Sequence, residues 1–117
     1  MDFCNNFSHD LKVGQVKEIQ LAEILEHKTI EVKHDLIATK TGNLFIEYES
    51  RGKPSGISKS NADYYCLCFG DTYAMIKTEN LKKLCRKHYK TKSDVLGGDN
   101  NTSKGILLPI YELFMKI

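Results

Sequence analysis

The run ADYYCLCFG, residues 62–70, constrains the fold more than any other part of this sequence. It is short, almost continuously apolar and followed by a Gly-Asp turn, which is typical of a strand covered on both faces. Such a strand needs neighbouring strands for its hydrogen bonds and other elements for its side chains. The run therefore predicts the central strand of a sheet.

The remaining patterns predict elements on either side of this strand. They are, in chain order, a helix at 8–27, strands at 28–39 and 42–50, the strand at 62–70, a strand at 72–78, a helix at 78–90, a turn-rich stretch at 93–105, and a last short strand ending near Pro109 before a turn of helix. The turn KTGN joins the first two strands as a hairpin. Thr78 is the expected cap of the second long helix.

These elements predict an α+β fold with a central mixed sheet flanked by helices. The order is αββββα with a short C-terminal strand and helix, in a single domain over residues 1–117. Hydrophobic residues make up 41% and charged residues 27%, which is typical of a globular chain. The spacing of the four cysteines fits neither a zinc site nor a disulfide framework, so we expect free thiols.

The sequence contains no apolar run near 18 residues and no leader-like start. We therefore expect no membrane span, no signal peptide and a cytoplasmic location.

Acidic residues gather around the predicted hairpin. Glu47 and Glu49 are two apart on one strand, so their side chains should share a face, and Asp35 ends the strand before. Such carboxylates repel one another unless the face is solvated or a cation lies between them. Mg²⁺ takes oxygen ligands and usually one or two carboxylates. A solvated acidic face and a metal site are the two interpretations.

Basic residues follow in two groups. Arg51 and Lys53 lie in the loop SRGKPSG directly after the acids, where they can meet phosphates. On the helix at 78–90, Lys83, Arg86 and Lys87 have i, i+3, i+4 spacing and share one side, whereas Lys82 falls off it. This side either contacts nucleic-acid phosphates or is simply exposed to solvent. The net charge of +2 is too small to decide between these two interpretations.

These residues resemble the PD-(D/E)XK nuclease superfamily, in which an acid at a strand end is followed by a second acid on the next strand. Here the pattern runs from Asp35 to Glu47-Tyr48-Glu49. The runs KTGNLFIEYESRGKPSGISKSNADYY and GGDNNTSKGILLP are similar to small phage-type nucleases related to archaeal Holliday-junction resolvases. The resemblance spans residues 10–109 and implies a restriction-endonuclease-like α/β sandwich.

The resemblance implies a Mg²⁺- or Mn²⁺-dependent endonuclease that acts on double-stranded or branched DNA, as a homodimer. The implied metal ligands are Glu18, Asp35 and Glu47, and the implied catalytic residues are Asp35, Glu47, Glu49 and Lys53. Glu49 stands where the superfamily usually has a lysine, for which Lys33, Lys53 or Lys59 can substitute. The residues expected to contact DNA are Arg51, Lys53, Lys59, Lys83, Arg86, Lys87 and Lys104.

Two other functions remain open on the sequence. One is a DNA-binding or assembly module that kept the nuclease fold and lost turnover, which Glu49 favours and the pair Asp35 and Glu47 opposes. The other is a small adaptor with no nucleic-acid role. Single residues also have simpler interpretations. Glu18 can be a solvated acid on a helix and not a metal ligand, and Arg51 can pair with Glu49 and not with a phosphate. Because the acids repel one another, we expect Asp35→Ala to leave the fold intact.

Overall fold

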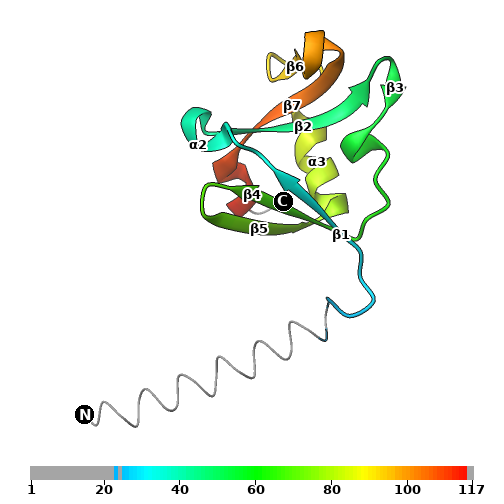
Figure 1. Cartoon of the computed structure of the whole chain (residues 1–117), viewed down its shortest axis with the longest axis vertical. Coiled ribbons are helices and arrows are strands. Elements are labelled where there is room, and N and C mark those ends of the chain that lie inside the picture. Colours follow the sequence, from blue (N-terminus) through cyan, green and yellow to red (C-terminus); the bar gives the residue numbers. More distant parts are fainter. Residues whose placement is uncertain (1–22, 24, 116–117) are drawn as a thin grey trace, which may run out of the picture.

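The computed structural model describes residue 23 and residues 25–115, which form an α+β protein with two sheets (Figure 1). The helices are α2 (Ala38–Thr41) and α3 (Thr78–His88), with short 3₁₀ helices η1 (Gly56–Ser58), η2 (Asp99–Asn101) and η3 (Ile110–Phe114). The strands are β1 (Ile30–His34), β2 (Asn43–Ser50), β3 (Lys53–Pro54), β4 (Tyr64–Phe69), β5 (Thr72–Lys77), β6 (Asp94–Gly97) and β7 (Ser103–Pro109).

Most of the helix predicted at 8–27, including Glu18, lies outside the described residues. Within the described part of the chain, every helix is too short or too polar to cross a membrane.

The first sheet has three strands in the order β1-β4-β5. β1 runs parallel to β4, with Val32 beside Cys66, and β5 runs antiparallel to β4, with Met75 opposite Cys66. This sheet is mixed. The apolar run at 62–70 forms its central strand and the segment at 72–78 a strand at its edge, as predicted. The expected cover on both faces of the central strand is wrong, because Cys66 lies between the exposed side chains of Val32 and Met75.

The second sheet is antiparallel, with four strands in the order β3-β2-β7-β6. β2 and β3 are joined by a two-residue turn in which Arg51 and Gly52 have φ of 52° and 78°, as a hairpin turn with matching twist requires. β7 ends at Pro109 and leads into η3, as predicted. β6 was not predicted, and the expectation of one central sheet is wrong because the strands divide between two.

The predicted hairpin between 28–39 and 42–50 is also wrong. β1 pairs with β4, and β2 pairs with β3 and β7, so the two strands belong to different sheets. The turn KTGN instead contributes the end of α2, where Gly42 has φ of 78° and its N–H donates to the carbonyl of Ala38. A left-handed glycine closes a helix as readily as it forms a hairpin turn.

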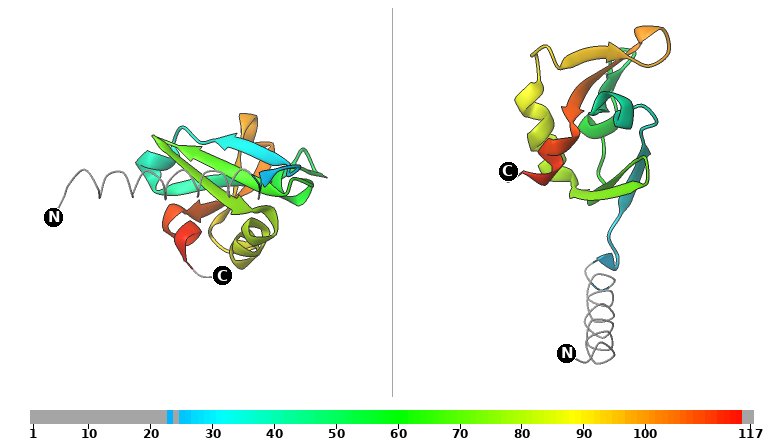
Figure 2. Two further views of the ribbon diagram at one scale, coloured as in Figure 1. Left: turned by 90° about the horizontal axis from the view of Figure 1, so that it is seen from below. Right: turned by 90° about the vertical axis from the view of Figure 1, so that its left-hand side faces the viewer.

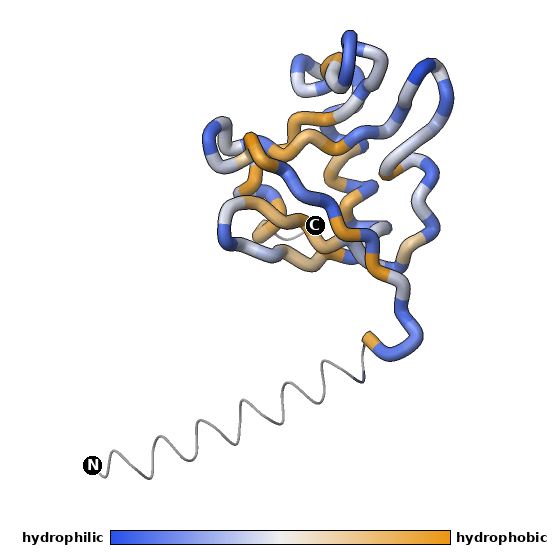
Figure 3. The backbone as a smooth tube through the Cα atoms, viewed as in Figure 1, coloured by the Kyte–Doolittle hydropathy of each residue, from blue (hydrophilic) through white to orange (hydrophobic). Residues whose placement is uncertain are grey.

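The core lies between the two sheets and α3. Its fully buried side chains are Leu44, Leu67, Leu81, Leu84, Ile106 and Leu108. Helix α3 contributes Leu81 and Leu84 to it and contacts β4, β5 and β7. Figure 3 shows this hydrophobic interior, with hydrophilic residues concentrated at the β2–β3 turn and the loop after β6. The described cysteines Cys66, Cys68 and Cys85 are free thiols, as predicted.

Helix α3 and η3 lie on the side of the molecule opposite β1 (Figure 2). The prediction that Thr78 caps α3 is wrong. Lys77 occupies the N-cap position, makes no side-chain cap bond, and leaves Thr78 as the first helical residue. The side chain of Thr78 is buried and its hydroxyl makes no hydrogen bond, so it does not cap the N–H groups of the first turn.

Candidate functional site

Asp35 lies between β1 and α2, where the backbone already uses most of its carboxylate. Oδ1 accepts the N–H of Ile37 at 3.0 Å and of Ala38 at 2.9 Å, and Oδ2 accepts the N–H of Phe45 at 2.9 Å. An ionised carboxylate has about four lone-pair sites, so one site on Oδ2 remains for a metal. Asp35 thus fastens the starts of α2 and β2 to the end of β1.

Glu47 and Glu49 do not share a face. β2 pairs Glu47 with Gly105 but Glu49 with Lys104, so a β-bulge at Tyr48 interrupts the alternation between the two acids. Glu49 and Tyr48 line one hollow, and Glu47 lines another. The Glu49 carboxylate lies 3.6 Å from the ammonium of Lys104, which takes the pairing role expected of Arg51.

Glu47 shares its hollow with residues of the other sheet. We call this space, lined by Glu31, Lys33, Glu47, Gly56 and Tyr65 with two isoleucines, the Glu47 hollow. Glu31 and Lys33 are paired with Tyr65 and Leu67 of β4, so all four side chains lie on one face of the sheet, where Glu31 is exposed and Lys33 is half-buried. The volume is about 20 Å³, which is room for one water or one small cation.

Hydrogen bonds hold the two carboxylates of the Glu47 hollow. Ser55 Oγ donates to Glu47 Oε2 at 3.0 Å, and Ser60 Oγ donates to Glu31 Oε1 at 3.0 Å. Gly56 keeps the loop close, since its φ is 52° and a Cβ there would collide with the carbonyl of Glu47. The loop SGISKS therefore supplies one hydroxyl donor to each of the two carboxylates.

One buried donor in the Glu47 hollow has no partner. Tyr65 is only 3% exposed, and its buried hydroxyl lies near the side chains of Ser60 and Glu31 without meeting either in good hydrogen-bond geometry. Burial also raises its pKa, so the hydroxyl stays protonated. An unpartnered buried polar group marks a place for a bound water or ligand oxygen. This observation makes the Glu47 hollow the strongest candidate for chemistry.

The described residues form no group of three or more His, Cys, Asp or Glu side chains suited to a metal. Asp35 lines a hollow of about 230 Å³ with His34, Cys68 and Tyr73, apart from Glu47. The structure therefore brings Glu31 and Lys33 to Glu47, and leaves Asp35 and Glu49 elsewhere. Sequence reasoning overlooked Glu31, although its i, i+2 spacing from Lys33 on one strand was a usable signal.

The expected DNA contacts divide into separate places. Arg51 and Lys53 are exposed on the β2–β3 turn, and Lys59 is exposed directly after η1. Lys83, Arg86 and Lys87 are exposed on α3, and none of them forms an ion pair with another described residue. We call these three side chains the α3 basic face. Its cations remain available to an external anion.

A second, larger hollow of about 440 Å³ lies between β2 and α3. Its aromatic wall is Tyr48 and Tyr89, whose ring centroids are 5.6 Å apart in an edge-on arrangement, and Arg86 lies at the same hollow. Tyr48 donates to Asp94 Oδ1 at 2.7 Å; burial and this bond raise the pKa of the tyrosine hydroxyl. Tyr48 is therefore held in place beside Arg86, while Tyr89 is 52% exposed.

Comparison of this chain with protein-family models, with curated proteins and with solved structures gave no significant match.

Proposed function

We propose that this protein is a Mg²⁺- or Mn²⁺-dependent endonuclease that hydrolyses DNA, with its catalytic centre at the Glu47 hollow. One observation carries the proposal: two hydrogen-bonded carboxylates, Glu31 and Glu47, line one small hollow with Lys33 and the unpartnered hydroxyl of Tyr65. Two carboxylates are the usual protein share of a Mg²⁺ site, with water and phosphate as the other ligands. This proposal keeps the likeness to PD-(D/E)XK nucleases and moves the lysine role to Lys33.

The residues of the hollow have distinct roles in this proposal. A bound Mg²⁺ supplies an acidified water and neutralises charge on the phosphate in the transition state. Glu47 and Glu31 provide its carboxylate ligands, oriented by Ser55 and Ser60. Lys33 orients the attacking water, which is the usual task of the superfamily lysine. Asp35 lines a separate hollow and takes no part in this centre, and Glu18 lies outside the described residues.

Binding and assembly complete the proposal. The α3 basic face, the exposed turn with Arg51 and Lys53, and Lys59 contact phosphates of double-stranded or branched DNA. Lys104 contacts a DNA phosphate and also pairs with Glu49, whose carboxylate lies 3.6 Å from its ammonium. The active unit is a homodimer, since cutting two strands requires two centres and each chain supplies one.

The first prediction tests the centre. Glu47→Gln and Lys33→Gln should each lower Mg²⁺-dependent cleavage by about a hundredfold, since each removes a group that acts on charge in the transition state. Cleavage is measured on linear, branched and single-stranded DNA with Mg²⁺, Mn²⁺ or EDTA. Glu26→Gln changes an exposed acid, 67% accessible, and is the matched control. Wild-type rates for both centre variants would remove the Glu47 hollow from the reaction.

A DNA-binding module without turnover is the second candidate. This function is favoured because two of the expected catalytic acids already have partners within the protein. Asp35 accepts three backbone N–H groups, and Glu49 pairs with Lys104. Under this function the wild-type chain binds DNA in a fluorescence anisotropy titration, and no cleavage appears with either metal. The same samples therefore separate the two functions.

A further inference from the structure

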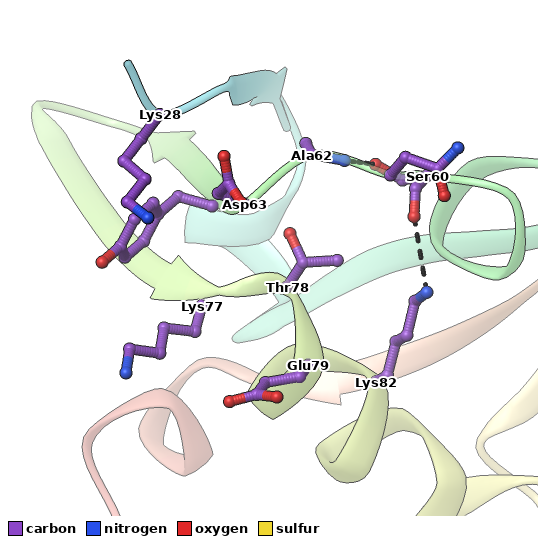
Figure 4. Close-up of a pocket in the computed structure, with 10 residues that line it drawn as sticks. Lys28, Ser60, Ala62, Asp63, Lys77, Thr78, Glu79 and Lys82 are labelled. Carbon is purple, nitrogen blue, oxygen red and sulfur yellow. Dashed lines mark hydrogen bonds between the residues drawn. The ribbon is translucent and has the colours of Figure 1, made fainter. Parts of the chain in front are cut away.

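A hollow of about 420 Å³ opens at the beginning of α3 (Figure 4). Its polar lining includes Lys28, Lys77, Lys82, Thr78, Asp63 and Glu79. We call it the Thr78 hollow. Figure 4 shows Lys28 and Lys77 on one side of Thr78 and Lys82 on the other. Lys82, which lies off the α3 basic face, lines this hollow as well as the one beside Tyr48 and Tyr89.

The helix end itself attracts an anion. The eleven residues of α3 begin without a side-chain cap, and the N–H of Thr78 donates to the carbonyl of Asp63 at 3.0 Å. The next N–H groups, of Glu79 and Asn80, therefore have no side-chain acceptor. Free N–H groups and the helix dipole together amount to about half a positive charge at this end.

A second observation is independent of the helix end. Thr78 is only 5% exposed, it lines the hollow, and its hydroxyl makes no hydrogen bond. A buried hydroxyl without a partner is costly, so its retention calls for an acceptor that fills the site when bound. The predicted cap of α3 is thus a free donor pointed into its own hollow.

The charges around the hollow favour an anion. Three lysines face two carboxylates, Asp63 and Glu79. The Oδ2 atom of Asp63 accepts the N–H of Thr29 at 2.8 Å and the Thr29 hydroxyl at 3.1 Å, and these bonds lower its pKa, so Asp63 stays negative and the three lysines exceed the two carboxylates by one charge. Lys82 donates to the carbonyl of Ser60 at 3.4 Å, which holds its ammonium beside the opening.

We propose that the Thr78 hollow binds a phosphate group, with the Thr78 hydroxyl and the first-turn N–H groups as donors and Lys28, Lys77 and Lys82 as counter-charges. A tetrahedral oxyanion presents several acceptor oxygens at once, which matches this set of donors. Where the phosphate belongs to DNA, the inference rests on the proposed function and adds a backbone contact beyond the α3 basic face. Binding of a phosphate group as such is independent of that function.

The second prediction uses inorganic phosphate as the probe. Titration of the isotope-labelled full chain should shift the amide signals of Glu79 and Asn80 in NMR spectra. Thr78→Val should weaken phosphate binding about tenfold, since a hydrogen bond to a charged group is lost, whereas Thr78→Ser should retain most of it. Lys77→Gln, on an exposed side chain, should weaken binding about threefold without affecting folding, and Lys40→Gln on α2 should have no effect.

Two results would overturn the inference. One is phosphate affinity in Thr78→Val and Lys77→Gln equal to that of the wild type, which would show scattered, adventitious binding. The other is the absence of shifts at Glu79 and Asn80.

Competition with one oligonucleotide, with and without a 5′ phosphate, identifies the kind of phosphate that the hollow binds. Stronger competition by the phosphorylated strand indicates a terminal phosphate, equal competition a backbone phosphodiester, and no competition by either removes the DNA part alone. Loss of DNA cleavage leaves all of these results unchanged.

Discussion

At the scale of single residues, Asp35 illustrates how one carboxylate can be read in two ways. The sequence places it at a strand end, where a metal ligand of a nuclease is expected. The structure gives it three backbone N–H partners on Ile37, Ala38 and Phe45. Sequence cannot distinguish these roles, because both need an acid at the end of a strand.

The third prediction follows from those contacts. Asp35→Ala leaves three N–H groups without their acceptor and should lower the free energy of unfolding by about 2 kcal/mol. This replaces the sequence-based expectation of an intact fold at no cost. Asp35→Asn keeps one acceptor oxygen and should lose about half as much. Urea denaturation followed by circular dichroism measures both variants. An unfolding midpoint for Asp35→Ala equal to that of the wild type would mean that the bonds contribute nothing.

Glu47 and Glu49 show a different limit of sequence reasoning at the same scale. A period of two predicts one face for both, and it fails because the bulge at Tyr48 adds a residue to β2 relative to β7. Nothing in the letters EYES marks a bulge. The regular β1 segment, by contrast, follows the period, and its spacing of Glu31 from Lys33 predicts the shared face that the structure has.

At the scale of elements, local patterns predict β4, β5, α3 and β7 well, and connections less well. The sequence did not predict β6, because Gly97 and Gly98 are typical of turns. In the structure a Cβ on Gly97 would lie only 2.7 Å from the ring of Phe45, and a Cβ on Gly105 of β7 would lie 2.5 Å from the same ring. The glycines are thus selected by a tertiary contact that a strand pattern does not contain.

The fourth prediction concerns α3 as an element. Its basic face carries Lys83, Arg86 and Lys87 on adjacent turns, without ion pairs among the described residues. The double variant Lys83→Gln with Arg86→Gln should weaken DNA binding for all sequences. It should also flatten the plot of log K against log salt by nearly two units, about 0.9 per lost phosphate contact. Fluorescence anisotropy at several salt concentrations measures the slope.

The control for this prediction is Lys40→Gln, which removes an exposed cation from α2. It should leave the slope unchanged, since Lys40 lies outside the α3 basic face. A double variant with the wild-type slope would assign the α3 basic face to solvent. Metal affinity at the Glu47 hollow should be unaffected in all of these variants, because none of them lines it.

At the scale of the whole molecule, the three-stranded sheet has one face that no other described element covers. Ile30, Val32, Tyr73 and Met75 lie on it with exposures of 41%, 56%, 75% and 45%, while α3 and η3 lie on the opposite side of the molecule (Figure 2). The pairing of Val32 with Cys66 and of Cys66 with Met75 makes these side chains one continuous row. An apolar row of this kind on a sheet favours contact with another surface.

The fifth prediction assigns that surface to a second copy of the chain, in keeping with the proposed homodimer. A two-fold axis would place each row against its equivalent, because a symmetric interface uses the same patch on both subunits. Light scattering should then give twice the monomer mass of 13.4 kDa. Val32→Lys should return the mass to that of the monomer, since a charge on each copy would lie in the interface. Leu36→Lys is the matched control, because Leu36 is 89% exposed but lies after β1 and off the row.

A monomer in solution is the competing outcome, and the wild type would then have the monomer mass at every concentration. The thiol of Cys66 separates the two cases, since it lies between Val32 and Met75 on this face. In a dimer, its alkylation should become faster on dilution and in Val32→Lys, because both changes expose the interface. A monomeric mass together with an alkylation rate that does not change on dilution would contradict the dimer.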